Sequence, residues 1–178
     1  MKIWFVTGTA TGLGFELVKL LLARGDKVAA TSRTPEKLIA SFGPESPSFL
    51  PLGVDLFSEQ SINEGVAKSI KHFGYIDVLV NNAGAGINGV FEEISEETIR
   101  KNFELNFFAP LRVIRAMAPH FRERKSGTIF NTSSIAAQHS FYGLSIYSAS
   151  KHALTGFTEG LRDELRHFGV RVCDVEPG

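Results

Sequence analysis

The sequence contains almost no cysteine and no excess of charge, and both features narrow its possible functions. Among its 178 residues the only cysteine is Cys173, within the apolar run Val170–Val175. One cysteine cannot form an internal disulfide, which is compatible with a reducing compartment, and we expect this thiol to be buried in a strand. The 19 basic and 19 acidic residues cancel, so neither nucleic acid nor an anionic membrane is predicted as a partner.

Long apolar runs and clustered metal ligands are lacking as well. The apolar start of the chain is interrupted at Gly8, which is too early for a membrane span, and no signal peptide is recognisable. The five histidines are scattered and none pairs with another or with the cysteine at metal-ligand spacing, so no metal is predicted. We therefore expect a cytoplasmic protein without a metal.

Apolar segments of two lengths alternate along the chain, and no repeat or linker separates them. The short segments predict strands at Ile3–Thr7, Lys27–Ser32, Ser48–Val54, Ile76–Asn81, Gly127–Thr132 and Val170–Val175. The amphipathic intervals predict helices at Leu13–Arg24, Pro35–Phe42, Ser58–Phe73, Ser95–Leu105, Phe107–Arg124 and Tyr147–Phe168. Such alternation is typical of an α/β fold in which helices cover both faces of a parallel sheet. We expect one domain over residues 1–178.

A glycine-rich segment joins the first strand to the first helix. In Thr7–Gly14, the position of Gly8 suits a sharp turn, Gly12 allows backbone to approach a phosphate, and Gly14 allows close packing of the helix on the sheet. The N-terminus of the following helix offers free N–H groups to a pyrophosphate. No Gly-Lys-Ser/Thr follows, which excludes a Walker-type phosphate loop.

A tyrosine and a lysine lie four positions apart in the last predicted helix. This spacing places the phenol of Tyr147 and the ammonium of Lys151 on one helix face. A cation within about 4–6 Å lowers the pKa of a tyrosine by roughly 1–3 units, which makes the phenol a usable proton donor and acceptor. Taken alone, the pair is better explained by an ordinary amphipathic helix. Its meaning comes from the motifs that accompany it.

Five motifs occur in order along the chain and together carry a resemblance. They are Thr7-Gly8 with Gly12 and Gly14, Asn81-Asn82-Ala83-Gly84, Asn106, Ser134, and Tyr147 with Lys151. The sequence resembles the short-chain dehydrogenase/reductase family, in its compact single-domain branch. The resemblance covers Thr7 to Gly178. It implies a Rossmann-type, three-layered, doubly wound parallel sheet with strand order 3-2-1-4-5-6, and self-association as a homodimer or homotetramer through helices Phe107–Arg124 and Tyr147–Phe168.

By the same resemblance, four residues are expected to carry the chemistry. Tyr147 would exchange a proton with the oxygen of a carbonyl or alcohol substrate while hydride passes to or from a nicotinamide. Lys151 would support the phenol and bind the nicotinamide ribose. Ser134, which has the expected separation from the tyrosine, would hold the substrate oxygen. Asn106 would bind a water that relays protons from Lys151. The histidines His139 and His152 have no implied partner.

Arg33 predicts NADP(H) in preference to NAD(H). It follows the second strand, where an acidic residue would bind the ribose of NAD, and a guanidinium there can bind a 2′-phosphate. No basic residue occupies Thr9–Thr11, which limits the expected preference. The full set of expected cofactor-binding residues is Gly8, Thr9, Gly12, Leu13, Gly14, Ser32, Arg33, Asp55, Leu56, Asn82, Ala83, Gly84, Tyr147, Lys151, Pro177 and Gly178.

The resemblance departs from the family at its end, because the chain stops at Pro177-Gly178. The family continues from this dipeptide into a substrate lid and a last strand, so we expect both to be missing and the strand Val170–Val175 to be an unprotected edge. The substrate is not predicted. Two functions remain open: an NADP-dependent oxidoreductase that interconverts a small carbonyl and an alcohol, and a nucleotide-binding fragment or regulatory relative without turnover.

Overall fold

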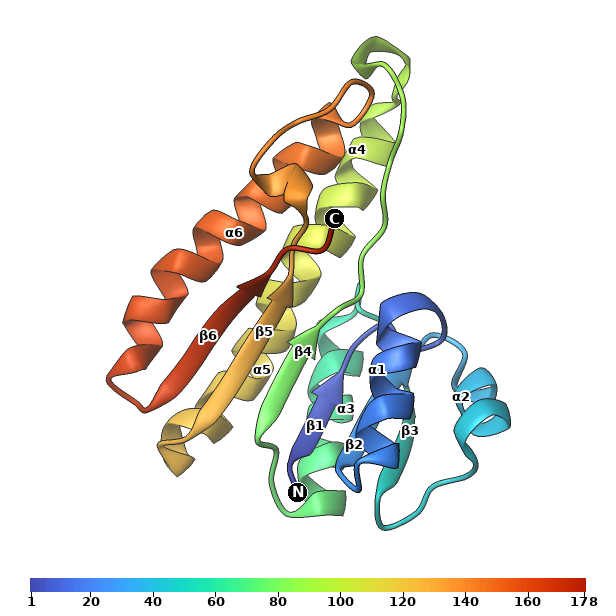
Figure 1. Cartoon of the computed structure of the whole chain (residues 1–178), viewed down its shortest axis with the longest axis vertical. Coiled ribbons are helices and arrows are strands. Elements are labelled where there is room, and N and C mark those ends of the chain that lie inside the picture. Colours follow the sequence, from blue (N-terminus) through green and yellow to red (C-terminus); the bar gives the residue numbers. More distant parts are fainter.

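Six parallel strands form one sheet in the computed structural model, which describes residues 1–178, and helices lie on both of its faces (Figure 1). The order β3-β2-β1-β4-β5-β6 confirms the expected doubly wound sheet. All five neighbouring pairs are parallel because each strand is followed by a helical crossover before the next begins. The strands are β1 Ile3–Val6, β2 Lys27–Ser32, β3 Phe49–Gly53, β4 Val78–Asn81, β5 Gly127–Thr132 and β6 Val170–Val175.

The helices follow the predicted pattern with one difference. They are α1 Gly12–Ala23, α2 Pro35–Phe42, α3 Glu59–Phe73, α4 Glu96–Phe103, α5 Ala109–Arg124 and α6 Ser145–Arg166, with short 3₁₀ turns η1 Phe91–Glu93 and η3 Ile135–Ala137. Ser58 and Ser95 cap α3 and α4, accepting from the N–H groups of Ser61 and Thr98. None of these helices is both long and apolar enough to cross a membrane.

The two helices expected around Asn106 are one continuous run. Between α4 and α5 the segment η2, Glu104–Phe108, is π-helical, and the N–H of Ala109 bonds the carbonyl of Glu104. Pro110, shortly after this segment, has no N–H to donate to the carbonyl of Asn106 four residues earlier. The widened turn keeps the helix going instead of ending it at Leu105. The predicted boundary was therefore wrong.

Two hydrophobic clusters hold the layers together. The larger, of 22 buried residues, lies between the sheet and α3, α5 and α6, and includes Phe5, Leu79 and Phe121. The smaller, of nine residues, lies under α1 and α2 and includes Val18 and Val80. Burying each such side chain stabilises the fold by about 1.5–3 kcal/mol. The carboxyl ends of the strands all emerge on one edge of this framework.

The sheet is not covered evenly. Over β5 and β6 only one face carries helices, α5 and α6, as Figure 1 shows at the orange and red strands. On the other face Phe130 and Cys173 are half-buried, and Val175 is 42% exposed. Nothing pairs with the outer edge of β6. In the strand order β6 is thus an edge strand.

Candidate functional site

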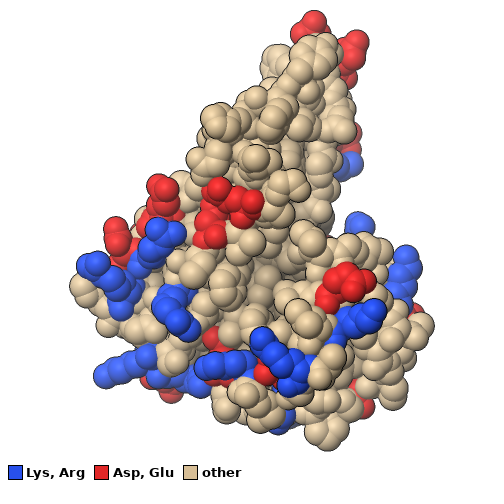
Figure 2. Space-filling model, viewed as in Figure 1, with Lys and Arg blue, Asp and Glu red and all other residues tan.

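A cavity of about 1070 Å³ opens where the carboxyl ends of the strands meet the following loops. Its lining runs from the glycine-rich turn, past the ends of β2, β4 and β5, to α4 and the first turns of α6. Open parallel sheets bind ligands at this edge. In Figure 2 the surface is notched between the projecting upper part and the lower right part of the molecule, with basic side chains on the lower rim. The volume is sufficient for a dinucleotide.

The glycine-rich turn is packed too tightly for side chains at two of its three glycines. Gly8 has φ of +69°, and a Cβ there would lie 2.7 Å from the Cα of Ala83. A Cβ on Gly14 would lie 2.4 Å from both the carbonyl oxygen of Gly8 and Nδ2 of Asn82. Glycine at these positions lets α1 begin directly against the ends of β1 and β4.

Gly12 is different, because the space beside it is open. It has φ of +63°, and an added Cβ would meet no atom within 4 Å. It begins α1, and the preceding Thr11 makes no side-chain cap bond to the helix. Free N–H groups at a helix N-terminus, next to open space, form a site for an anion. This end of the cavity can hold a pyrophosphate.

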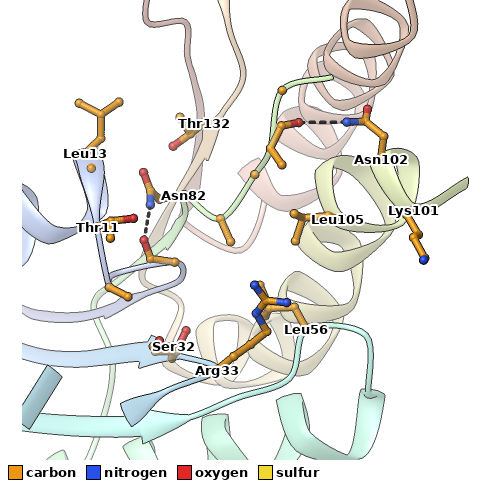
Figure 3. A pocket seen from close by; sticks show the side chains of 18 of the residues that line it. Thr11, Leu13, Ser32, Arg33, Leu56, Asn82, Lys101, Asn102, Leu105 and Thr132 are labelled. Carbon is orange, nitrogen blue, oxygen red and sulfur yellow. Dashed lines mark hydrogen bonds between the residues drawn. The ribbon is translucent and has the colours of Figure 1, made fainter. Parts of the chain in front are cut away.

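Asn82 and Thr7 hold the turn in place. Asn82 Nδ2 donates to the carbonyl oxygens of Thr7 and Gly8, each at 3.0 Å, and one of these bonds is drawn in Figure 3. The hydroxyl oxygen of Thr7 accepts from the N–H groups of Asn82 and Ala83. These bonds satisfy backbone groups that a tight turn leaves unpaired. Thr9, by contrast, is fully buried and donates to the carbonyl of Thr31 at 3.0 Å.

Cationic and apolar groups line the far end of the cavity. The side chain of Arg33, directly after β2, extends into the cavity toward Leu56 and Leu105 (Figure 3). Lys37, in the first turn of α2, also lines it. The sequence analysis missed Lys37. The available signal was its position four residues after Arg33, at the start of the helix that follows the same strand.

The proposed acid–base pair lies at the end of the cavity opposite Arg33 and Lys37. Tyr147 and Lys151 both line the cavity, and the Lys151 amine is 5.8 Å from the centroid of the Tyr147 ring. Lys151 is only 4% exposed, and its Nζ donates to the carbonyl of Thr132 at 2.7 Å. Burial lowers the pKa of Lys151 to about 8, and the carboxylate of Asp174 opposes this shift. An amine with this pKa is still mostly charged at pH 7.

Asn106 and Gly84 meet beside Lys151. The Asn106 amide binds both backbone groups of Ala85, accepting from its N–H and donating to its carbonyl, each at 2.9 Å. It also donates to the hydroxyl of Ser150 at 3.1 Å. A Cβ on Gly84 would lie 3.2 Å from Asn106 Oδ1 and 3.3 Å from Lys151 Nζ. The amide therefore ties the loop after β4 to α6, next to the lysine.

The two adjacent serines have different surroundings. Ser133 lines the cavity, and its hydroxyl contacts Thr155 and the carbonyl of Lys151. Ser134 is 8% exposed, and its hydroxyl oxygen accepts from the N–H of Ala136 as the cap of η3. The carbonyl of Pro177 accepts from the next N–H, that of Ile135, at 3.1 Å. The last residues of the chain thus hold the loop that carries Ser134.

Most of the expected site residues surround one cavity. Twelve line it: Gly8, Gly12, Leu13, Ser32, Arg33, Leu56, Asn82, Ala83, Gly84, Tyr147, Lys151 and Pro177. The others do not line it: Thr9, Gly14, Asp55, Asn106, Ser134 and Gly178. Among these, Asp55 accepts from the N–H of Phe57 and shapes the turn after β3. α4 contributes lining residues that were not predicted, namely Thr98, Lys101, Asn102 and Leu105.

The burial of Lys151 predicts a pH dependence of folding stability. The unfolded chain keeps this proton up to about pH 10.4, whereas the native chain loses it near pH 8. The free energy of unfolding should therefore rise with pH across this window. Below the window, the folded protein bears the full cost of burying the charged amine. Relative to Lys151→Met, the wild type should gain about 3 kcal/mol between roughly pH 7 and pH 10.5. Urea unfolding at the two pH values measures this gain, and a constant difference would contradict it. Lys19→Met, an exposed position on α1, is the control.

Comparison with known proteins gives a consistent result across the whole chain. The family model described as short chain dehydrogenase matches residues 2–178. The sequence is 40% identical over 182 residues to the uncharacterized oxidoreductase YusZ of Bacillus subtilis, covering 99% of this chain and 64% of that protein. A crystal structure of a short-chain dehydrogenase from Streptomyces avermitilis superposes with a TM-score of 0.92 at 41% identity, over 99% of this chain and 65% of that one. The chain thus spans just under two thirds of the length of these relatives.

Two other similar structures contain nicotinamide cofactors. ElxO with NADP bound has a TM-score of 0.93 at 28% identity, over 100% of this chain and 74% of that one. A 3-ketoacyl-(acyl-carrier-protein) reductase from Brucella melitensis, complexed with NADH, has a TM-score of 0.93 at 26% identity, over 99% and 75%. Both forms of the cofactor therefore occur among the similar structures.

Proposed function

Because this chain belongs to the short-chain dehydrogenase/reductase family, we propose that it transfers hydride between NADP(H) and a small carbonyl or alcohol substrate. The observation that carries the proposal is that one cavity joins the glycine-rich turn to Tyr147 and Lys151. The residues present fit a dinucleotide: open space and free N–H groups at Gly12 suit the pyrophosphate, and cations lie at the opposite end.

In the reductive direction the hydride for the carbonyl carbon would come from NADPH when it is bound. Tyr147 donates its phenolic proton to the carbonyl oxygen, so that carbon and oxygen gain one hydrogen each. Lys151 would keep a positive charge beside the resulting phenolate and would help to hold the cofactor ribose. Ser134 does not line the cavity, and by the family resemblance its hydroxyl would donate to the substrate oxygen where negative charge develops. Asn106 positions the loop after β4 against α6 and supports a water that resupplies protons to Lys151.

We assign the preference for NADP(H) to Arg33 and Lys37 together. Both line the same end of the cavity, and no acidic side chain lines it. Two cations offer a 2′-phosphate charge-assisted hydrogen bonds that a free ribose hydroxyl cannot match. The NADP bound to ElxO is consistent with this assignment, while the NADH complex shows that the fold alone does not decide it.

Titration with NADPH and NADH tests the cofactor assignment directly. We expect Arg33→Ala and Lys37→Ala each to weaken NADPH binding by about tenfold while changing NADH binding little, since only NADPH carries the phosphate. Nicotinamide fluorescence gives both dissociation constants. Lys101→Ala is the matched control: Lys101 also lines the cavity but pairs with Glu97 at 2.6 Å, so its loss should not change the ratio. Equal binding of both cofactors to the wild type would contradict the assignment.

A screen of ketones and aldehydes with NADPH then tests turnover. Binding of the cofactor without oxidation of NADPH by any carbonyl would favour the alternative function, a nucleotide-binding module. The short length relative to the family members motivates this comparison. We further propose that the protein is cytoplasmic. We also propose that it self-associates as a homodimer or homotetramer through α5 and α6. Light scattering at micromolar concentration measures the oligomeric state.

A further inference from the structure

The carboxylate of Asp174 lies on β6, at a position where the alternation of side chains along the strand predicts an apolar residue. Along β6, Val170 and Val172 point into the larger hydrophobic cluster, and Asp174 continues the same row. Its neighbours in the sheet are also polar: Asn131 pairs with it on β5, and Asn81 pairs with Asn131 on β4. A polar row therefore crosses three strands beneath α6.

Hydrogen bonds connect Asp174 to the cavity through two hydroxyl groups. Thr155, one helical turn after Lys151 on α6, donates to Asp174 Oδ2 at 2.5 Å. Since the Thr155 proton is used there, the single proton of the Ser133 hydroxyl lies between two acceptors, the hydroxyl oxygen of Thr155 at 2.9 Å and the carbonyl of Lys151 at 3.3 Å. The backbone N–H of Ser133 donates to the carbonyl of Val175 at 2.7 Å. The chain Ser133–Thr155–Asp174 thus joins β6 to the wall of the cavity.

The second carboxylate oxygen, Asp174 Oδ1, is buried without a hydrogen-bond partner. Burial raises the pKa of Asp174 and the nearby Glu176 raises it further, while the bond from Thr155 and the charge of Lys151 lower it. In return, Asp174 raises the pKa of Lys151 against the effect of burial. The other titratable group beside Lys151 is Tyr147, and β5 and η2 present only neutral side chains there, Thr132, Ser133 and Asn106.

We propose that Asp174 is a positioning residue for Lys151: the carboxylate, held by Thr155, supplies a buried negative charge that keeps the Lys151 ammonium protonated at the cavity. The inference concerns the charge of Lys151 in this chain, and its consequence for turnover rests on the proposed function. The Lys151 amine donates to the carbonyl of Thr132 and Asp174 accepts from Thr155, so the two groups do not bond each other and the carboxylate acts at a distance. Thr155 has two roles in this arrangement, as the donor that stabilises the carboxylate and as its link to Ser133.

The direction of the effect follows from the charges. Asp174→Asn keeps an oxygen that can accept from Thr155 but removes the negative charge, so burial acts on Lys151 without opposition. The pKa of Lys151 should therefore fall. If the proposed reaction occurs, the loss of activity on the alkaline side should move down in pH by the same amount.

The experiment measures Lys151 itself, in the whole chain and without turnover. In protein labelled with ¹³C-lysine, the Cε resonance of Lys151, assigned with Lys151→Arg, is followed between about pH 6 and pH 10.5. We expect the titration midpoint of Lys151 to be lower in Asp174→Asn and unchanged in Glu176→Gln. Glu176→Gln is the matched control, because the Glu176 carboxylate binds Gln138. An unchanged midpoint in folded Asp174→Asn, or an equal shift in Glu176→Gln, would overturn the proposal.

A second pair of variants covers the case in which Asp174→Asn does not fold. Thr155→Val removes the donor to Asp174 and should lower the midpoint of Lys151 by a smaller amount, because the carboxylate then holds its charge less well. Thr155→Ser keeps the hydroxyl and should have the wild-type midpoint. If Thr155 served only for packing, the midpoint of the Lys151 titration would be the same as in the wild type in both variants. A shifted midpoint without any turnover would support this inference while contradicting the proposed function.

Discussion

Tyr147→Phe is expected to lower turnover by about 10²–10⁴-fold while leaving NADPH affinity nearly unchanged. The substitution removes only the hydroxyl, and the ring keeps its place in the wall of the cavity beside Lys151. A general acid or base supplies about this much of the rate, and no other phenol lines the cavity. Initial rates with an active carbonyl substrate, together with a fluorescence titration of NADPH, separate catalysis from binding.

The matched control for this variant is Tyr142→Phe, because Tyr142 is 93% exposed and loses the same hydroxyl group. Its rate should equal that of the wild type. Retention of more than about a tenth of the wild-type rate in Tyr147→Phe would show that another group moves the proton. That result would leave the cofactor site intact but would assign the chemistry to a different residue.

Gly14→Ala is expected to destabilise the fold by about 3 kcal/mol and to abolish measurable cofactor binding. The new methyl group would lie 2.4 Å from the carbonyl of Gly8 and from Nδ2 of Asn82. Neither atom can retreat freely, because Asn82 binds the carbonyls of both Thr7 and Gly8. Overpacking of a rigid site costs about 1–3 kcal/mol, and the disturbed turn no longer presents its N–H groups to a pyrophosphate.

A second helical glycine provides the control. Gly156 lies within α6, and a Cβ there would meet nothing within 4 Å. Gly156→Ala should therefore stabilise the protein by up to about 1 kcal/mol, through helix propensity alone. Urea unfolding of both variants, with an NADPH titration of each, makes the comparison. Equal stability of Gly14→Ala and wild type would mean that the turn can open without cost.

Sequence patterns correctly predicted the features that depend on residues close together in the chain. The glycines at positions 8, 12 and 14 were interpreted from spacing alone, and the structure finds contact at Gly8 and Gly14 and open space at Gly12. The alternation of short apolar segments with amphipathic ones likewise predicted the parallel sheet. The order of the strands came from the resemblance.

Three features of the structure were not predicted from the sequence. The π-helical segment contains Asn106, whose side chain bonds Ala85 and Ser150. Lys37 lines the cavity only because α2 begins beside the end of β2. Asp174 appeared only as part of an apolar strand, and its contact with Thr155 exists because α6 packs across β5 and β6.

By itself, then, the sequence determined that this protein is an α/β domain with a glycine-rich turn and a Tyr147–Lys151 pair, since hydrophobic periodicity, glycine conformation and helical spacing act over a few residues. Only the tertiary structure decided which polar side chains surround Lys151, how deeply that amine is buried, and which second cation accompanies Arg33. The reason is physical: burial and electrostatic interaction depend on distances in space, which chain separation does not specify.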